Sequence, residues 1–107
     1  MDVYVKYCDN YENIQKQIDY LLNSVLENGS VVKKGMNVFL KTNALAPHPK
    51  ERAITTHPRV VEAVIKYFKK YDVNIFVGDN PATKEMKTVY KVNGTLEVVE
   101  KENVELA

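Results

Sequence analysis

The side chains best suited to chemistry lie in three short segments of the sequence. Lys41-Thr42-Asn43 and Gly78-Asp79-Asn80 each follow an apolar run, and Thr55-Thr56-His57 precedes a proline. Amines, hydroxyls and amides can hold an anion, a carboxylate can hold a metal ion or a hydroxyl, and an imidazole with a pKa of ~6.5 can transfer a proton. The candidate ligand-binding residues are Lys41, Asn43, Thr55, Thr56, Asp79 and Asn80, with His57 as the candidate catalytic residue and Asp79 as the candidate metal ligand.

Each of these residues also has a structural interpretation. Lys41 could bind an anion, or it could form a salt bridge with Asp79 across neighbouring strands. Asn43 could orient a ligand or close an Asx turn. Asp79 could contact a ligand, or it could cap the turn that follows Gly78.

His57 is open to two interpretations as well. It could act as a general acid or base or bind a metal ion. It could instead cap a helix that begins at Pro58, with the Thr56 hydroxyl as a further cap. The free N–H groups and the dipole of such a helix would favour a nearby anion by about 0.3–1 kcal/mol.

Hydrophobic periodicity predicts the elements that would position these residues. Val3, Val5 and Tyr7 alternate with polar residues, which predicts a strand over residues 3–8. The continuous apolar run within residues 37–41 is typical of a central strand covered on both faces. The other expected elements are helices over residues 14–26, from Pro58, over residues 83–92 and from Thr95, a strand over residues 74–77 and the opening of a strand at residues 104–106.

This order of elements predicts a single α/β domain over residues 1–107. The expected architecture is an open, mainly parallel sheet of three to four strands with helices packed on its faces. The carboxyl ends of parallel strands share one rim, where open sheets bind ligands. Lys41, Asp79 and the helix start at His57 should therefore meet at that rim. Residues 42–57 form a long connection, which is typical of a functional loop.

Composition and missing motifs exclude several classes of protein. A net charge of +1 without a clustered basic face gives no case for nucleic-acid binding. Cys8 is the only cysteine, which excludes an internal disulfide and a cysteine-ligated iron–sulfur cluster in this chain. The sequence has no glycine-rich nucleotide loop and no GxSxG nucleophile motif.

The sequence also gives no sign of a membrane partner. Its longest apolar runs fall well short of the ~18–20 residues that a transmembrane helix needs. The first residues lack the charged start and apolar stretch of a signal peptide. We therefore expect a cytoplasmic protein.

Three motifs together resemble domain of unknown function 362 (DUF362), a family often labelled iron–sulfur-centre proteins. The likeness extends over essentially the whole chain, although Thr42 and Asn80 stand where the family pattern has proline and serine. It implies that this chain is the N-terminal half of a longer family domain. Many members continue into a cysteine-rich, ferredoxin-like segment, so their cluster does not carry over to this chain. The motifs are Phe39-Leu40-Lys41-Thr42-Asn43, Thr55-Thr56-His57-Pro58 and Val77-Gly78-Asp79-Asn80-Pro81.

The expected function is binding of a small anionic or metal-linked ligand at the rim, in a redox-related pathway and with an unknown cofactor. Lys41 and the helix start at Pro58 would hold negative charge, Asp79 a metal ion or hydroxyl, and His57 would transfer a proton. The alternative is a non-catalytic interaction module or a truncated fragment that assembles through the sheet edge near Val104–Leu106. Its partner would be a second copy or a missing C-terminal half.

Overall fold

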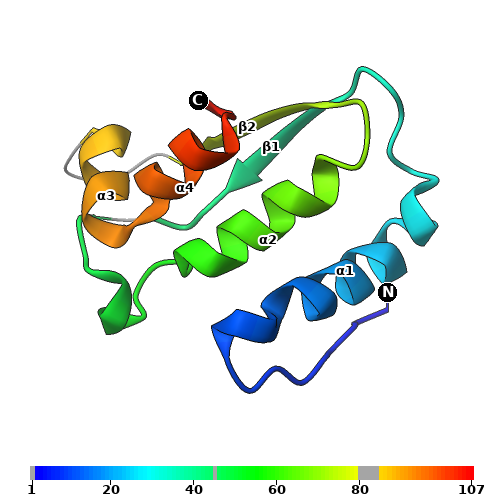
Figure 1. The fold of residues 1–107 in the computed structure, drawn as a ribbon, viewed down its shortest axis with the longest axis horizontal. Helices are drawn as coiled ribbons and strands as arrows, with labels where there is room; N and C mark the ends of the chain where they lie inside the picture. The colour runs from blue at the N-terminus through cyan, green and yellow to red at the C-terminus, as the bar shows by residue number, and fades with distance from the viewer. Residues whose placement is uncertain (1, 45, 80–84) are drawn as a thin grey trace.

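A computed structural model describes residues 2–44, 46–79 and 85–107. Within them, three parallel strands form a sheet in the order β1-β2-β3, accompanied by four α-helices (Figure 1). The predicted fold class, an open parallel α/β sheet, is confirmed. The strands are β1 (Asn37–Lys41), β2 (Asn74–Gly78) and β3 (Glu105–Leu106); the helices are α1 (Ile14–Val25), α2 (Pro58–Phe68), α3 (Met86–Asn93) and α4 (Thr95–Glu102); and short 3₁₀ helices lie at Tyr11–Asn13, Glu27–Gly29 and Lys50–Arg52.

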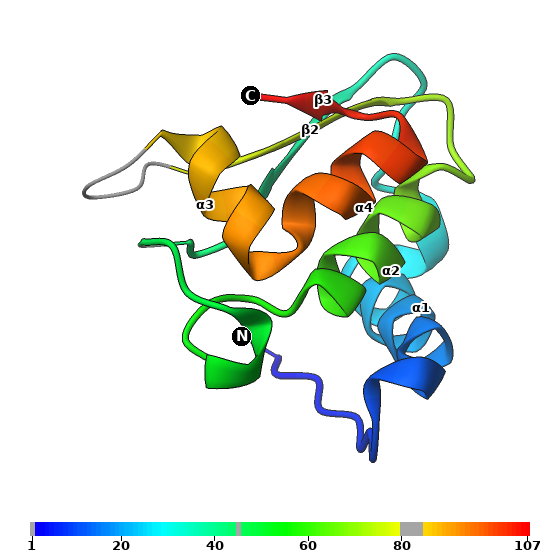
Figure 2. The ribbon, with the colours of Figure 1, turned by 60° about the vertical axis from the view of Figure 1, so that its left-hand side comes forward.

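The helices lie together on one side of the sheet, as Figure 2 shows. Val38 and Leu40 of β1 are half-buried in the core, whereas Phe39 between them is 56% exposed. In the neighbouring strand β2, Ile75 and Val77 are buried in the same core. Within the described residues β1 pairs only with β2, so it is an edge strand, and only one of its faces is covered. The expectation of a central strand covered on both faces was therefore wrong: Phe39, although apolar, lies on the helix-free face.

The strand predicted over residues 3–8 is also not formed. These residues are assigned to no helix or strand, and Val3, Val5 and Tyr7 are 81%, 85% and 82% exposed. Figures 1 and 2 show the segment beyond α1, away from the sheet. Alternation of apolar and polar residues describes a chain that could be half-buried, but a strand also needs a neighbour for its backbone N–H and C=O groups.

The core is formed by the covered face of the sheet together with α2, α3 and α4. By contrast, α1 contains no fully buried residue and packs as an outer layer against α2. A hydrogen bond ties the two helices together, because the Tyr67 hydroxyl donates to Asn23 Oδ1 over 2.7 Å. The largest fully buried apolar side chains of the core are those of Ile65, Tyr67, Val77, Val89 and Tyr90.

Two glycines allow close approaches that a side chain would crowd. Gly94, between α3 and α4, has a left-handed φ of 91°, and a Cβ there would lie 3.3 Å from Pro58 Cγ. Gly78, at the end of β2, has neighbours on both sides. A Cβ at this position would lie 3.1 Å from Ala107 Cβ and 3.2 Å from Phe39 Cζ. Gly94 thus lets the α3–α4 junction pack against the start of α2, and Gly78 lets the Phe39 ring lie beside β2.

Candidate functional site

The carboxyl ends of β1 and β2 bring together three predicted site residues, Lys41, Asn43 and Asp79, which we call the rim cluster. Lys41 pairs in register with Gly78, so Asp79 follows directly beside it. Lys41 Nζ donates to Asn43 Oδ1 over 3.1 Å and lies 3.4 Å from Asp79 Oδ1. The Lys41 side chain is 63% exposed and that of Asp79 only 5%. The amine is thus held in place from one side and open to solvent on the other.

Asp79 also fixes the backbone that follows β1. Its Oδ2 accepts a hydrogen bond of 2.6 Å from the backbone N–H of Ala44, which is fully buried. Asn43, directly before Ala44, has a left-handed φ of 55°, a conformation that asparagine tolerates better than most residues. The salt bridge considered for Lys41 is therefore formed. Asn43 directs its amide oxygen to Lys41 Nζ, and the two contacts together preset the geometry of the rim cluster.

Below the rim cluster, a buried hydrogen bond connects the end of β1 to α3. Thr42 Oγ1 and the Tyr90 hydroxyl are 2.6 Å apart, and both residues are almost fully buried. Burial raises the pKa of Tyr90, and the negative charge of Asp79 raises it further, so the phenol keeps its proton at neutral pH. This pair anchors the rim from beneath, although nothing in the sequence spacing of residues 42 and 90 indicates it.

A groove runs between the open edge of β1 and α2, and we call it the β1–α2 groove. Its volume is about 260 Å³. The predicted site residue Thr56 contributes to it, and Thr55, one residue earlier, is half-buried. Lys41 belongs both to this groove and to the rim cluster. The groove is lined by Phe39, Leu40, Lys41, Thr42, Thr56, Val60, Val61 and Val64.

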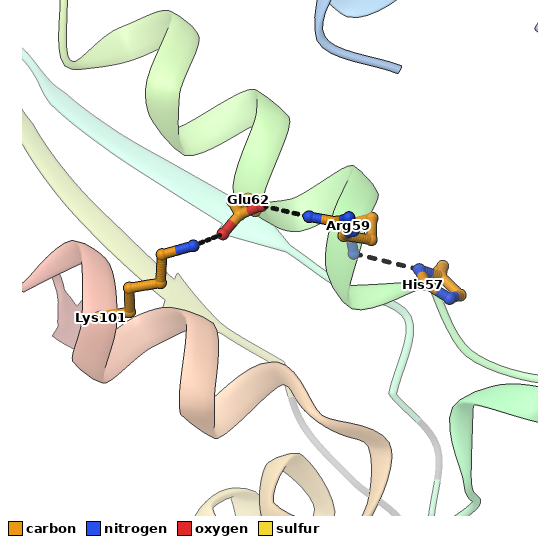
Figure 3. A network of polar contacts seen from close by, with 4 residues as sticks. All are labelled: His57, Arg59, Glu62 and Lys101. Atoms are coloured by element: carbon orange, nitrogen blue, oxygen red, sulfur yellow. Dashed lines mark hydrogen bonds and ion pairs between the residues drawn. The ribbon is translucent and has the colours of Figure 1, made fainter. Parts of the chain in front are cut away.

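His57 makes contacts that differ from those of the rim cluster. It caps α2, because its Nδ1 accepts a hydrogen bond of 3.1 Å from the backbone N–H of Arg59 (Figure 3). Its ring stacks on Tyr11, with 3.8 Å between ring centroids and 9° between planes. Partial burial lowers the pKa of His57, and the cations Lys50 and Arg59 lower it further. The imidazole is thereby kept neutral, which the capping hydrogen bond requires.

His57 also lines a second cavity of about 360 Å³, together with Lys50, Glu62 and Lys101 among others. Glu62 is buried between two cations: Lys101 Nζ lies 2.8 Å from Oε2 and Arg59 Nη1 lies 3.4 Å from Oε1 (Figure 3). The hydrogen bond from Lys101 lowers the pKa of Glu62. Sequence reasoning missed this network. The spacing of Arg59 and Glu62, three residues apart on one helix, was a usable signal in the sequence. The pairing of Glu62 with Lys101 on α4 could not be read from the sequence.

The capping role of His57 leads to a prediction about pH. Because the pKa of His57 is lowered by folding, the unfolded chain binds more protons than the folded one as the pH falls through 6.5, and stability is lost there. Wild-type protein should therefore lose more stability between pH 7 and pH 5 than His57→Asn. Asparagine can cap the same N–H without titrating, whereas His57→Ala should cost about 1 kcal/mol at pH 7 through loss of the cap.

Urea unfolding at several pH values measures these differences directly. The comparison of wild type with His57→Asn removes the contribution of all other titrating groups. Equal pH dependence of the two proteins would mean that protonation of His57 does not weaken the cap.

Metal binding by Asp79 stays a prediction. No group of three or more histidine, cysteine, aspartate or glutamate side chains suited to a metal ion occurs among residues 2–44, 46–79 and 85–107. Asp79, the predicted metal ligand, directs its carboxylate to Ala44 and Lys41. Asn80, the remaining predicted site residue, lies outside the described residues.

No helix in the described part of the chain is long and apolar enough to cross a membrane.

A family model described as "Domain of unknown function (DUF362)" matches residues 38–107, which is more than half of the sequence. The matched range includes all three motifs and begins within β1. No curated protein and no solved structure matches the chain.

Proposed function

Since the chain belongs to the DUF362 family, whose function is unknown, we propose that it binds a small anionic ligand at the carboxyl rim of its sheet. The ligand's anionic group contacts Lys41, and its apolar part occupies the β1–α2 groove. The observation that supports this most is the position of Lys41, which is held by Asn43 and Asp79, exposed to solvent and part of the groove lining.

The chemistry of the groove favours a ligand with one polar end. Lys41 and Thr42 come from the carboxyl end of β1 and Thr56 from the segment just before α2, so the polar lining residues belong to neighbouring parts of the chain. The other lining residues are Phe39, Leu40, Val60, Val61 and Val64, which are apolar, although the Phe39 ring itself lies on the helix-free face. A short-chain carboxylate fits this distribution, because it pairs a single charge with an apolar body.

The electrostatics of the polar end are moderate in strength. Asp79 offsets part of the Lys41 charge, so a bound carboxylate would add a second, exposed partner to an existing ion pair. Partly exposed pairs of this kind contribute about 0.2–1 kcal/mol. The apolar part must therefore supply much of the affinity, and we expect weak binding that grows with the length of the ligand's carbon chain.

Sodium hexanoate is a suitable probe, with the uncharged hexanamide as its comparison. Hexanoate should shift the backbone amide signals of Lys41, Thr42 and Thr56 in an NMR titration. Lys41→Gln should weaken binding by about fivefold, the factor that corresponds to ~1 kcal/mol. Lys34→Gln is the matched control, because it removes the same charge from a side chain that is 86% exposed and pairs with Asp72.

Two results would contradict the proposal. One is equal affinity for hexanoate and hexanamide, which would show that the charge of Lys41 plays no part. The other is a set of shifted signals confined to the second cavity near His57. A proton-transfer role for His57 stays a prediction, as does the redox-related pathway. In such a role Nε2 would be the acting atom, because Nδ1 accepts from Arg59.

A further inference from the structure

The free edge of β1 presents unpaired backbone groups along a full strand. Met36 O accepts from Asn74 N over 2.8 Å, and Thr42 N donates to Gly78 O over 3.4 Å. Bonding residues alternate in a parallel ladder, so even-numbered positions from 36 to 42 face β2. The N–H and C=O groups of Asn37, Phe39 and Lys41 therefore point away from β2, and within the described residues no strand pairs with them.

The layer beneath this edge is only partly covered. Val60 and Val64 of α2 are half-buried and line the β1–α2 groove. The outer helix α1 has apolar residues at helical spacing but none that is fully buried. A strand placed beside β1 would cover this region with apolar side chains.

Residues 3–8 have the sequence pattern that such a strand requires. Val3, Val5 and Tyr7 form one apolar face and are more than 80% exposed in the structure. The segment is tethered near the groove, because Tyr11 stacks on His57, the residue after Thr56. If the segment turned from this point toward the start of β1, residue 8 would lie near the carboxyl end of β1, and the segment would run parallel to it.

The handedness of crossovers supports the same position. Parallel strand–helix–strand units are almost always right-handed. With β2 on one side of β1, a strand on the other side would place its own crossover helix on the same face as α2. That crossover helix would be α1, and Figure 2 shows α1 and α2 packed on the same face.

We propose that residues 3–8 add to the free edge of β1 as a fourth, parallel strand and cover the β1–α2 groove. The structure then represents the state in which this segment is released. Strand addition does not depend on the ligand. Its one consequence that rests on the proposed function is that the docked strand and the ligand exclude each other from the groove.

Site-resolved amide hydrogen exchange without ligand tests this inference. In wild-type protein the outward amides of Phe39 and Lys41 should be protected, as are the inward amides of Val38 and Leu40. The double variant Val3→Asp, Val5→Asp should speed exchange at Phe39 and Lys41 by at least about tenfold. Val38 and Leu40 should keep their rates, which shows that the sheet remains folded.

Lys6→Asp is the control variant, since it places the same side chain on the opposite face of the segment and should leave Phe39 and Lys41 protected. Free exchange of these two amides in wild-type protein would overturn the proposal, and so would equal rates in wild type and the double variant. Protection that disappears on dilution, with a solution mass of two chains, would assign the strand to a second copy and would also overturn it. Hexanoate binding does not enter these measurements, so the ligand proposal can fail separately.

Discussion

Replacing Tyr90 by alanine is expected to lower the free energy of unfolding by about 3–5 kcal/mol. The side chain is fully buried in the core, and its hydroxyl is 2.6 Å from Thr42 Oγ1. Its removal leaves a cavity between α3 and the sheet and also deprives a buried hydroxyl of its partner. Because domains of this size are stable by about 5–15 kcal/mol, urea unfolding should show a large loss in this variant.

Smaller substitutions separate the hydrogen bond from the packing. Tyr90→Phe should cost about 1–2 kcal/mol, because the Thr42 hydroxyl stays buried without a partner. When Thr42→Val is already present, Tyr90→Phe should cost much less, since no hydroxyl is then left unsatisfied. Additive effects in this double-mutant cycle would show that the short contact contributes nothing beyond packing.

The second large effect is expected at Asp79. Asp79→Ala should lower the free energy of unfolding by about 2 kcal/mol, because the buried backbone N–H of Ala44 loses its acceptor. The same change removes the ion pair that holds Lys41, so the rim cluster loses its geometry as well as stability. Hexanoate affinity should fall together with stability, as followed by NMR titration and urea unfolding.

Asp79→Asn is the informative comparison. An amide oxygen can still accept from Ala44 N, so most of the stability should return. The charge interaction with Lys41 is lost in both variants. A loss of stability in Asp79→Asn as large as in Asp79→Ala would show that charge, and not the hydrogen bond to the backbone, is the main contribution.

The meeting of Lys41 and Asp79 could be predicted because it depends only on topology. Neighbouring parallel strands end at the same rim, and each of these residues follows its own strand directly. The same reasoning placed Thr56 and His57 near that rim. It could not decide which way each side chain turns, and the structure places Thr56 in the β1–α2 groove and His57 on Tyr11 in the next cavity.

Features that depend on distant partners were not visible in the sequence. Glu62 and Lys101 meet across two helices, and Thr42 and Tyr90 meet across a strand and a helix. Residues 3–8 show the opposite case, because the sequence pattern there is typical of a strand but the segment pairs with no neighbouring strand in the structure. Local periodicity reports which face of a segment is apolar, whereas tertiary contacts decide whether that face is used.

The bare backbone at Gly78 links three positions that are far apart in the sequence. Its φ is not left-handed, so glycine is favoured here for space and not for backbone conformation. Phe39 Cζ and Ala107 Cβ would lie only 3.2 Å and 3.1 Å from a Cβ at this position. A side chain at residue 78 therefore requires the Phe39 ring or Ala107 to shift, and a smaller residue at 39 or 107 should reduce that cost. We accordingly expect these three sites to vary jointly during evolution.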